Sequence, residues 1–222
     1  MNINRSRITL LAGAALLFAA CADDSAAQPT ATTATTATTV DSYVPRHDAG
    51  ATSSSAVELT QDEIEGLLWM REEEQLAHDV YIALGDEWGL RIFDNISASE
   101  TSHVERVVGL LDRYGIDDPM ADRPDGTFTI PEMQTLYDEL VADGSESLVR
   151  ALEVGALIEE LDIVDLRDRA TDIADIAAVY DLLERGSHNH LRAFTRQLDA
   201  RDVTYEPTVL DAAAYDEIVS ET

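Results

Sequence analysis

The chain has 222 residues, with 44 acidic side chains against 15 basic ones and a formal net charge of −29. This charge excludes a nucleic-acid-binding protein that works through a broad basic surface, because affinity for phosphates needs clustered lysine and arginine. It does not indicate disorder throughout, since 45% of the residues are hydrophobic and acidic disordered chains are poor in apolar residues. The single cysteine excludes an intramolecular disulfide framework and a cysteine-rich metal site.

Residues 1–21 have the pattern of a bacterial lipoprotein signal peptide. Arg5 and Arg7 give a positive start, and the apolar run that follows is too short to span a membrane. The run ends in the sequence LFAAC, which resembles a lipobox. We predict that Cys21 becomes the lipidated N-terminus and anchors the protein to a membrane of the cell envelope, outside the cytoplasm. Ordinary signal cleavage followed by secretion is the alternative, because small residues flank Cys21.

Residues 22–56 are rich in alanine, threonine and serine and show no apolar periodicity. Such a composition cannot bury enough surface to fold. We predict a disordered tether between the membrane and a folded domain over residues 57–222.

The folded domain is predicted to be helical. The segment from Thr60 to Glu63 has the form of a capping box, and Pro131 is placed to open a helix at its first turn. Apolar residues recur at steps of three and four, and no alternation of useful length indicates a strand. We predict an all-α bundle of two helical hairpins, with a short extra helix between the second and third long helices and a C-terminal tail. The expected helices cover about 60–87, 96–114, 131–144, 147–168, 172–200 and 211–219.

Polar residues interrupt the apolar faces of these helices. In the first helix, Glu74 and His78 lie in line with Leu67 and Tyr81, which indicates that Glu74 points into the bundle. We expect the neighbouring acids to form a solvated run and His78 to be an ion-pair partner rather than a ligand. Tyr81 is most simply a packing residue.

The other long helices carry further acids and histidines. Glu100 and His103 have the spacing that sets a carboxylate and an imidazole side by side on one helical face. Ser97-x-x-Glu100 also has the form of a capping box, so Glu100 could instead satisfy a backbone amide at a helix start. The remaining candidates are Glu159 and Glu160 in the third long helix and His190 in the fourth, with His188 expected at the surface.

These residue types suit a metal centre. Carboxylates can bridge two divalent cations, and imidazole nitrogen suits iron, manganese and zinc. A bundle with Glu-x-x-His on facing helices and single carboxylates on the others is the arrangement of di-iron and di-manganese carboxylate proteins. Two histidines on apolar faces, each near acids, are better explained by one shared site than by two separate ones.

Residues 57–222 resemble the ferritin-like family of domains of unknown function 2202. The stretches that carry the resemblance are MREEEQLA at 70–77, ASETSH at 98–103, LDRYG at 111–115, GALIEELDI at 155–163 and GSHNHLRAF at 186–194. The resemblance implies a ferritin-like four-helix bundle. Wider relatives bind a di-metal centre and use it for peroxide reduction, oxygen chemistry or iron oxidation. By this resemblance the metal ligands are Glu74, Glu100, His103, Glu159 or Glu160, and His190.

One departure from that pattern concerns Ser187, which stands three residues before His190, where the wider relatives have glutamate. The site is then incomplete or holds one ion only, unless Asp162 or Glu184 substitutes. We therefore expect one or two iron or manganese ions, with peroxide- or oxygen-linked oxidoreductase activity left open. The alternatives are metal sequestration without turnover and a non-enzymatic envelope or interaction protein that retains the scaffold. A homo-oligomer is also left open.

Overall fold

The computed structural model describes residues 58–221, which form α-helices and contain no β-strand. The predicted signal peptide, Cys21 and the predicted tether lie outside these residues. Within the described part, no helix is both long and apolar enough to cross a membrane. The helices are α1 (Gln61–Trp88), α2 (Arg91–Tyr114), α3 (Pro131–Gly144), α4 (Leu148–Asp168), α5 (Ala174–Asp199) and α6 (Ala212–Ser220).

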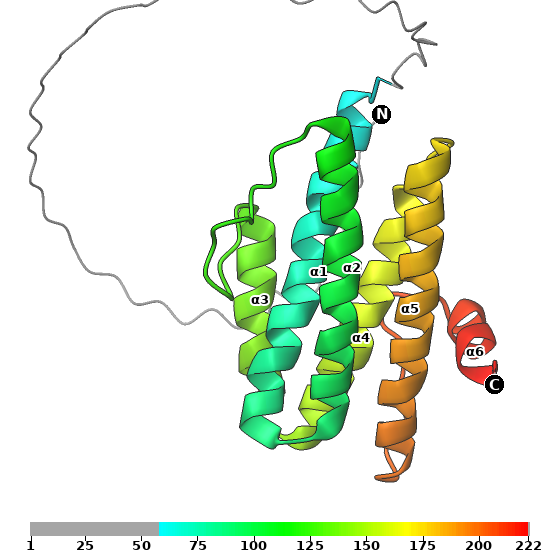
Figure 1. Cartoon of the computed structure of the whole chain (residues 1–222). Helices are drawn as coiled ribbons and strands as arrows, with labels where there is room; N and C mark the ends of the chain where they lie inside the picture. Colours follow the sequence, from blue (N-terminus) through cyan, green and yellow to red (C-terminus); the bar gives the residue numbers. More distant parts are fainter. Residues whose placement is uncertain (1–57, 222) are drawn as a thin grey trace, which may run out of the picture. The chain divides into compact units, whose positions relative to one another are not determined.

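The four long helices form a bundle of two hairpins (Figure 1). The helix α1 packs mainly on α2, and α4 packs mainly on α5. The short helix α3 covers α1 and α4 from one side, while α6 lies against α5 on the other. This arrangement confirms the all-α bundle with an extra helix between the second and third long helices.

Local sequence signals explain most helix ends. Thr60 and Glu63 form the predicted capping box at the start of α1, with the Thr60 amide donating to the Glu63 carboxylate at 2.7 Å. Gly89 and Gly115 end α1 and α2 in the left-handed conformation, which glycine adopts without steric cost. Pro131 opens α3 as predicted.

The start of the second long helix differs from its prediction. The helix α2 begins at Arg91 rather than near residue 96, so that only two residues separate it from α1. Its first turn lacks a side-chain cap but carries the fully buried Phe93, so packing rather than capping fixes this turn. Ser97 and Glu100 therefore lie inside the helix. The alternative that Glu100 belongs to a capping box is wrong.

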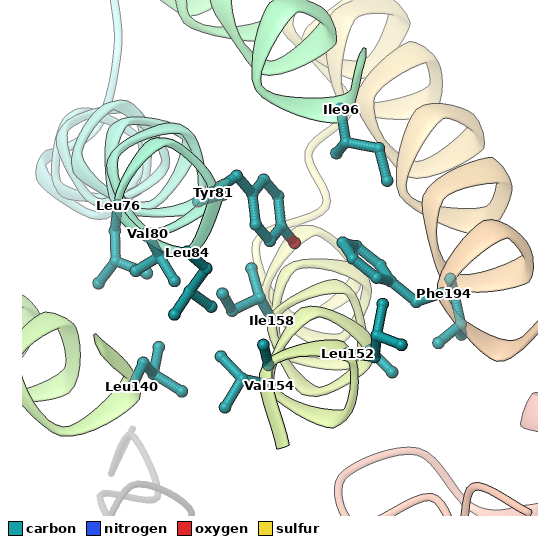
Figure 2. Close-up of a cluster of buried hydrophobic side chains, with 14 of the residues drawn as sticks. Leu76, Val80, Tyr81, Leu84, Ile96, Leu140, Leu152, Val154, Ile158 and Phe194 are labelled. Atoms are coloured by element: carbon teal, nitrogen blue, oxygen red, sulfur yellow. The ribbon is translucent and has the colours of Figure 1, made fainter. Parts of the chain in front are cut away.

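The hydrophobic core contains two apolar clusters with a polar layer between them. Along α1, Leu67 and Met70 belong to one cluster and Leu76 to the other. The second of these clusters includes Tyr81 and Phe194, whose ring centroids lie 5.3 Å apart. Figure 2 shows these two side chains approaching each other from α1 and α5. The helix positions between the two clusters hold the candidate site residues.

The acids next to Glu74 are buried, and the prediction that they form a solvated run is wrong. Glu72 and Glu73 are only 1% and 4% exposed, because α2, α3 and α4 all pack on α1. Glu72 accepts hydrogen bonds from the backbone amides of Thr129 and Ile130 just before α3, at 2.9 and 3.0 Å. Glu73 accepts one from the Trp69 indole nitrogen at 3.1 Å. The first of these acids therefore fastens the loop before α3 to the bundle.

Candidate metal centre

Side chains from all four long helices meet in the polar layer. His103 Nδ1 lies 2.7 Å from Glu100 Oε2 and 3.2 Å from Glu74 Oε2. His190 Nδ1 lies 2.8 Å from Glu100 Oε1 and 3.5 Å from Glu159 Oε2. All five residues are buried, so the cluster is largely shielded from water.

Glu100 stands at the centre of the cluster. It belongs to two groups of potential ligands, one with Glu74 and His103 and the other with Glu159 and His190. Within each group the ligand atoms lie within 4.8 Å of one another. Two ligand groups that share one carboxylate could hold two neighbouring cations.

The cluster also contains polar atoms whose hydrogen-bonding capacity is unused. Buried polar atoms in folded proteins nearly always have a partner, so exceptions require an explanation. Glu100 Oε1 and His190 Nδ1 lie close together but are not aligned for a hydrogen bond. Across the described residues, every buried side-chain nitrogen or oxygen without a hydrogen-bond partner lies in this layer. These atoms are Glu74 Oε1, Glu100 Oε1, Asp162 Oδ1 and His190 Nδ1. Such a donor set fits divalent cations.

Both histidines present Nδ1 to the carboxylates, and their rings stack with centroids 5.5 Å apart. The far nitrogen of His190, Nε2, lies 3.0 Å from Ser99 Oγ, a contact that fixes the ring orientation. The far edge of His103 lies against Gly186 of α5, where a Cβ atom would come within 2.5 Å of the ring. A glycine at this position therefore makes room for the ring.

The electrostatics of the cluster follow from burial and from the two histidines. Burial raises the pKa of Glu74 to about 7 and also raises the pKa of Glu159. Burial acts in the same direction on Glu100, but His190 and His103 outweigh it and lower the pKa to about 2. Burial opposes protonation of the histidines, yet the surrounding carboxylates raise the pKa of His103 to about 11 and that of His190 to about 10. Without a cation, both histidines therefore hold protons at neutral pH.

Tyr81 takes part in the site in a way that the sequence did not reveal. Its hydroxyl donates to Glu159 Oε1 at 2.5 Å, which leaves Oε2 on the side of His190. Tyr81 lies seven residues after Glu74, on the same helical face. That spacing was visible in the sequence, but it also fits an ordinary core residue, and Tyr81 does pack in the core.

The structure separates the two acids that the sequence could not distinguish. Glu159 lies in the cluster, whereas Glu160 points to the C-terminal segment. There the Glu160 carboxylate accepts hydrogen bonds from the Tyr205 hydroxyl and from the Val209 and Leu210 amides, the last two at 2.8 and 2.7 Å. Glu160 is thus an anchor for the tail and is not part of the candidate metal centre.

Other polar candidates also lie outside the centre. His78 pairs with Asp79 at 2.8 Å, as predicted. The Glu184 carboxylate lies 2.7 Å from Arg167 and 3.5 Å from His188, which is partly exposed. Glu184 therefore does not substitute for the carboxylate that is absent at position 187.

Comparisons with known proteins agree with the resemblance to the domain of unknown function 2202. The uncharacterised protein MJ0754 of Methanocaldococcus jannaschii is 46% identical over 164 residues, which cover 73% of this chain and 89% of that protein. The crystal structure of hypothetical protein MJ0754 matches with a TM-score of 0.73 and 42% identity, over 82% of this chain and 99% of that one. Residues 63–222 match the uncharacterised protein domain DUF2202. The chain therefore belongs to the DUF2202 family.

Proposed function

We propose that this domain is a ferritin-like metal-binding domain that holds two divalent iron or manganese ions in its polar layer. The observation that carries this proposal is the concentration of unpartnered buried polar atoms in two ligand groups that share Glu100. Burying ionised groups without compensation is costly, and a cation between them removes that cost.

Iron and manganese fit the donor set better than calcium and magnesium do. The layer offers carboxylate oxygens and imidazole nitrogens, with no thiolate, and mixed oxygen and nitrogen ligands suit these two metals. Calcium and magnesium prefer sites made of oxygen alone. In this assignment Glu74, Glu100 and His103 hold one ion, and Glu100, Glu159 and His190 hold the other.

A pair of redox-active ions would supply electrons for reducing peroxide or dioxygen, as in the wider ferritin-like proteins. The residues of this chain set the conditions for that chemistry. Tyr81 fixes the orientation of Glu159, and Ser99 fixes that of His190. The buried position of the layer limits access of water. We also propose that lipidated Cys21 and the segment 22–56 tether this domain to the cell envelope.

A second function is favoured by a specific observation, namely that Ser187 occupies a position where the wider relatives have a glutamate ligand. The carboxylates and histidines of the layer also contact one another directly at 2.7 to 3.5 Å. In this reading the layer is a network of ion pairs, and the domain is a non-enzymatic envelope or interaction protein that retains the bundle.

Metal binding distinguishes the two functions. The purified protein is stripped with a chelator and titrated with Mn²⁺ or, without oxygen, with Fe²⁺, and the ions bound per chain are counted. We expect two ions, a raised melting temperature in their presence, and a large loss of both in His103→Gln. His188→Gln is the matched control, because His188 lies on α5 outside the ligand groups. A protein that binds neither metal, and whose stability is insensitive to chelators, would refute the proposal and favour the ion-pair network.

A further inference from the structure

Asp162 is an acid of the polar layer that belongs to neither ligand group. It lies on α4 and is 5% exposed. Its Oδ2 atom accepts a hydrogen bond from the Ser187 hydroxyl, whereas its Oδ1 atom has no hydrogen-bond partner. A buried carboxylate with one oxygen held by a hydrogen bond and one oxygen free is arranged to bind an ion or a polar group through the free oxygen.

Contacts between α4 and α5 place Asp162 one helical turn from Glu159. Glu159 contacts His190, and Asp162 contacts Ser187. Asp162 lies three residues after Glu159 on α4, and Ser187 lies three residues before His190 on α5. Residues three apart lie on the same side of a helix. Asp162 therefore faces the same interior layer as Glu159, one step along the bundle.

Contacts between α1 and α4 show what Asp162 faces on the other side. Tyr81 bonds to Glu159 at 2.5 Å, and Trp69 bonds to Asp165 at 2.8 Å. In the sequence, Asp162 lies midway between Glu159 and Asp165 on α4, and Glu74 lies near the midpoint between Trp69 and Tyr81 on α1. This register places Asp162 opposite Glu74. The pKa of Asp162 agrees with this placement, because after burial the charge of Glu74 is the largest influence that raises it.

We propose that Asp162 Oδ1 is a fourth protein ligand of the cation held by Glu74, Glu100 and His103, an inference that rests on the proposed function. Ser187 then orients the ligand, since its hydroxyl donates to Asp162 Oδ2 and leaves only Oδ1 of Asp162 to bind the cation. The carboxylate missing from α5 is thus supplied from α4 by the neighbour of Ser187. The position held by Glu100, Glu159 and His190 gains no such ligand, so the two positions are unequal.

The alternative ligand at this place is Ser187 itself. A neutral hydroxyl is a weaker ligand than a carboxylate for iron or manganese. The Ser187 oxygen also lies 3.0 Å from the Leu183 carbonyl, so its single proton is shared between two acceptors. An ionised carboxylate is the stronger acceptor, and the hydroxyl is best explained as an outer partner that orients Asp162.

The test compares Mn²⁺ binding by the wild-type protein, Asp162→Asn and Asp165→Asn, using calorimetric titration, metal counting and the melting temperature with and without metal. Asparagine keeps the shape of Asp162 and a bond to Ser187 but removes the charge, so it presents either an amide nitrogen, which is not a ligand, or a neutral carbonyl oxygen, which is a weaker ligand than a carboxylate. We expect the tighter binding step, which belongs to the position with four ligands, to lose at least about tenfold in affinity, or the count to fall from two ions to one. Asp165→Asn changes the same residue type one turn away, where it bonds to Trp69, and we expect its affinity to match the wild type within about twofold.

Ser187→Ala provides a second variant that retains the Asp162 carboxylate. We expect a smaller loss at the same binding step, because Asp162 remains but is no longer oriented. The metal-free Asp162→Asn protein should melt at or above the wild-type temperature, since the substitution removes a buried carboxylate that lacks a counter-charge. Two ions bound to Asp162→Asn with wild-type affinities would refute this inference and leave the proposed function standing. A wild-type protein that binds no metal would refute both.

Discussion

The space that Gly186 leaves for His103 gives a sharp test of how the bundle builds the site. A Cβ atom at residue 186 would lie 2.5 Å from both Cε1 and Nε2 of the His103 ring. Carbon atoms in contact normally lie about 3.5–4.0 Å apart, so Gly186→Ala requires the ring or the helix to move by about 1 Å. The ring is not free to move, because its other edge lies 2.7 Å from Glu100.

Two opposing effects set the magnitude for stability. Alanine is favoured over glycine inside a helix by about 0.8–1.0 kcal/mol. Forcing an extra methyl group into a packed interior costs about 1–3 kcal/mol. The net loss of unfolding free energy is therefore about 0–2 kcal/mol, or roughly 0–8 °C in melting temperature for a domain of this size. The effect on Mn²⁺ affinity should be larger, at least about tenfold, because an error of 1 Å in one ligand disturbs the whole donor set.

Gly144→Ala is the matched control for this experiment. A Cβ atom there would meet Leu84 at 2.7 Å, a similar clash at the end of α3 that involves no group of the site. Chemical unfolding and Mn²⁺ titration of both variants separate packing from site geometry. We expect similar or smaller destabilisation in Gly144→Ala and normal metal binding. Wild-type Mn²⁺ affinity in Gly186→Ala would refute the view that this glycine positions a ligand.

Further expectations concern pH, Tyr81 and Glu160. The raised pKa values of His103 and His190 mean that a bound metal must displace protons, so Mn²⁺ affinity should rise with pH. Calorimetry in buffers of different ionisation enthalpy would detect the proton release. A Mn²⁺ affinity independent of pH would contradict this expectation. The metal-free protein should behave in the opposite way. The histidines stabilise the metal-free fold fully below their unfolded pKa near 6.5, and this stabilisation is lost as pH rises toward 10–11. The raised pKa of Glu74 removes further stability between about pH 4.5 and 7. The free energy of unfolding measured in urea should therefore fall from about pH 5 upward. Tyr81→Phe removes the donor to a buried carboxylate and should cost about 1–3 kcal/mol in urea unfolding, with Phe93→Leu as a packing control that leaves metal affinity unchanged. Glu160→Gln should cost about 1–3 kcal/mol and speed hydrogen exchange at residues 208–210 while leaving the metal count at the wild-type value; a reduced count would place Glu160 in the site after all.

The sequence predicted the parts of this fold that depend on local patterns. Five helix positions and the capping box at Thr60 follow from apolar periodicity and from capping chemistry. The first turn of α2 does not, because the burial of Phe93 rather than a local signal places it there. The burial of Glu72 and Glu73 was also hidden, since it depends on α3 covering α1. Sequence periodicity shows which residues share a helical face but not which other helix covers that face.

The same limit applies to the candidate site. Glu74, Glu100, His103 and His190 could be selected because each interrupts an apolar face, and the structure brings these four together. The distinction between Glu159 and Glu160 was beyond the sequence. Both are buried neighbours on α4, and only the course of the C-terminal segment shows that Glu160 is engaged by backbone amides. The pairing of Asp162 with Ser187 likewise joins residues on two helices whose register the sequence does not specify.

The charges of the buried layer give the proposed function a thermodynamic reason. Four carboxylates, from Glu74, Glu100, Glu159 and Asp162, share the layer with two histidines. Even with both histidines protonated, negative charge is in excess, and the pKa of Asp162 is raised well above its ordinary value, first by burial and then by neighbouring acids. The metal-free domain must therefore hold protons on acids that are normally ionised, at a cost to its stability near neutral pH. Two divalent cations would neutralise most of this charge and leave the histidines neutral, as ligands must be. A layer selected only to hold the helices together would be more stable with fewer acids, because replacing buried ion pairs with apolar residues is often stabilising. The excess of buried acids is thus better explained by binding cations than by structural support.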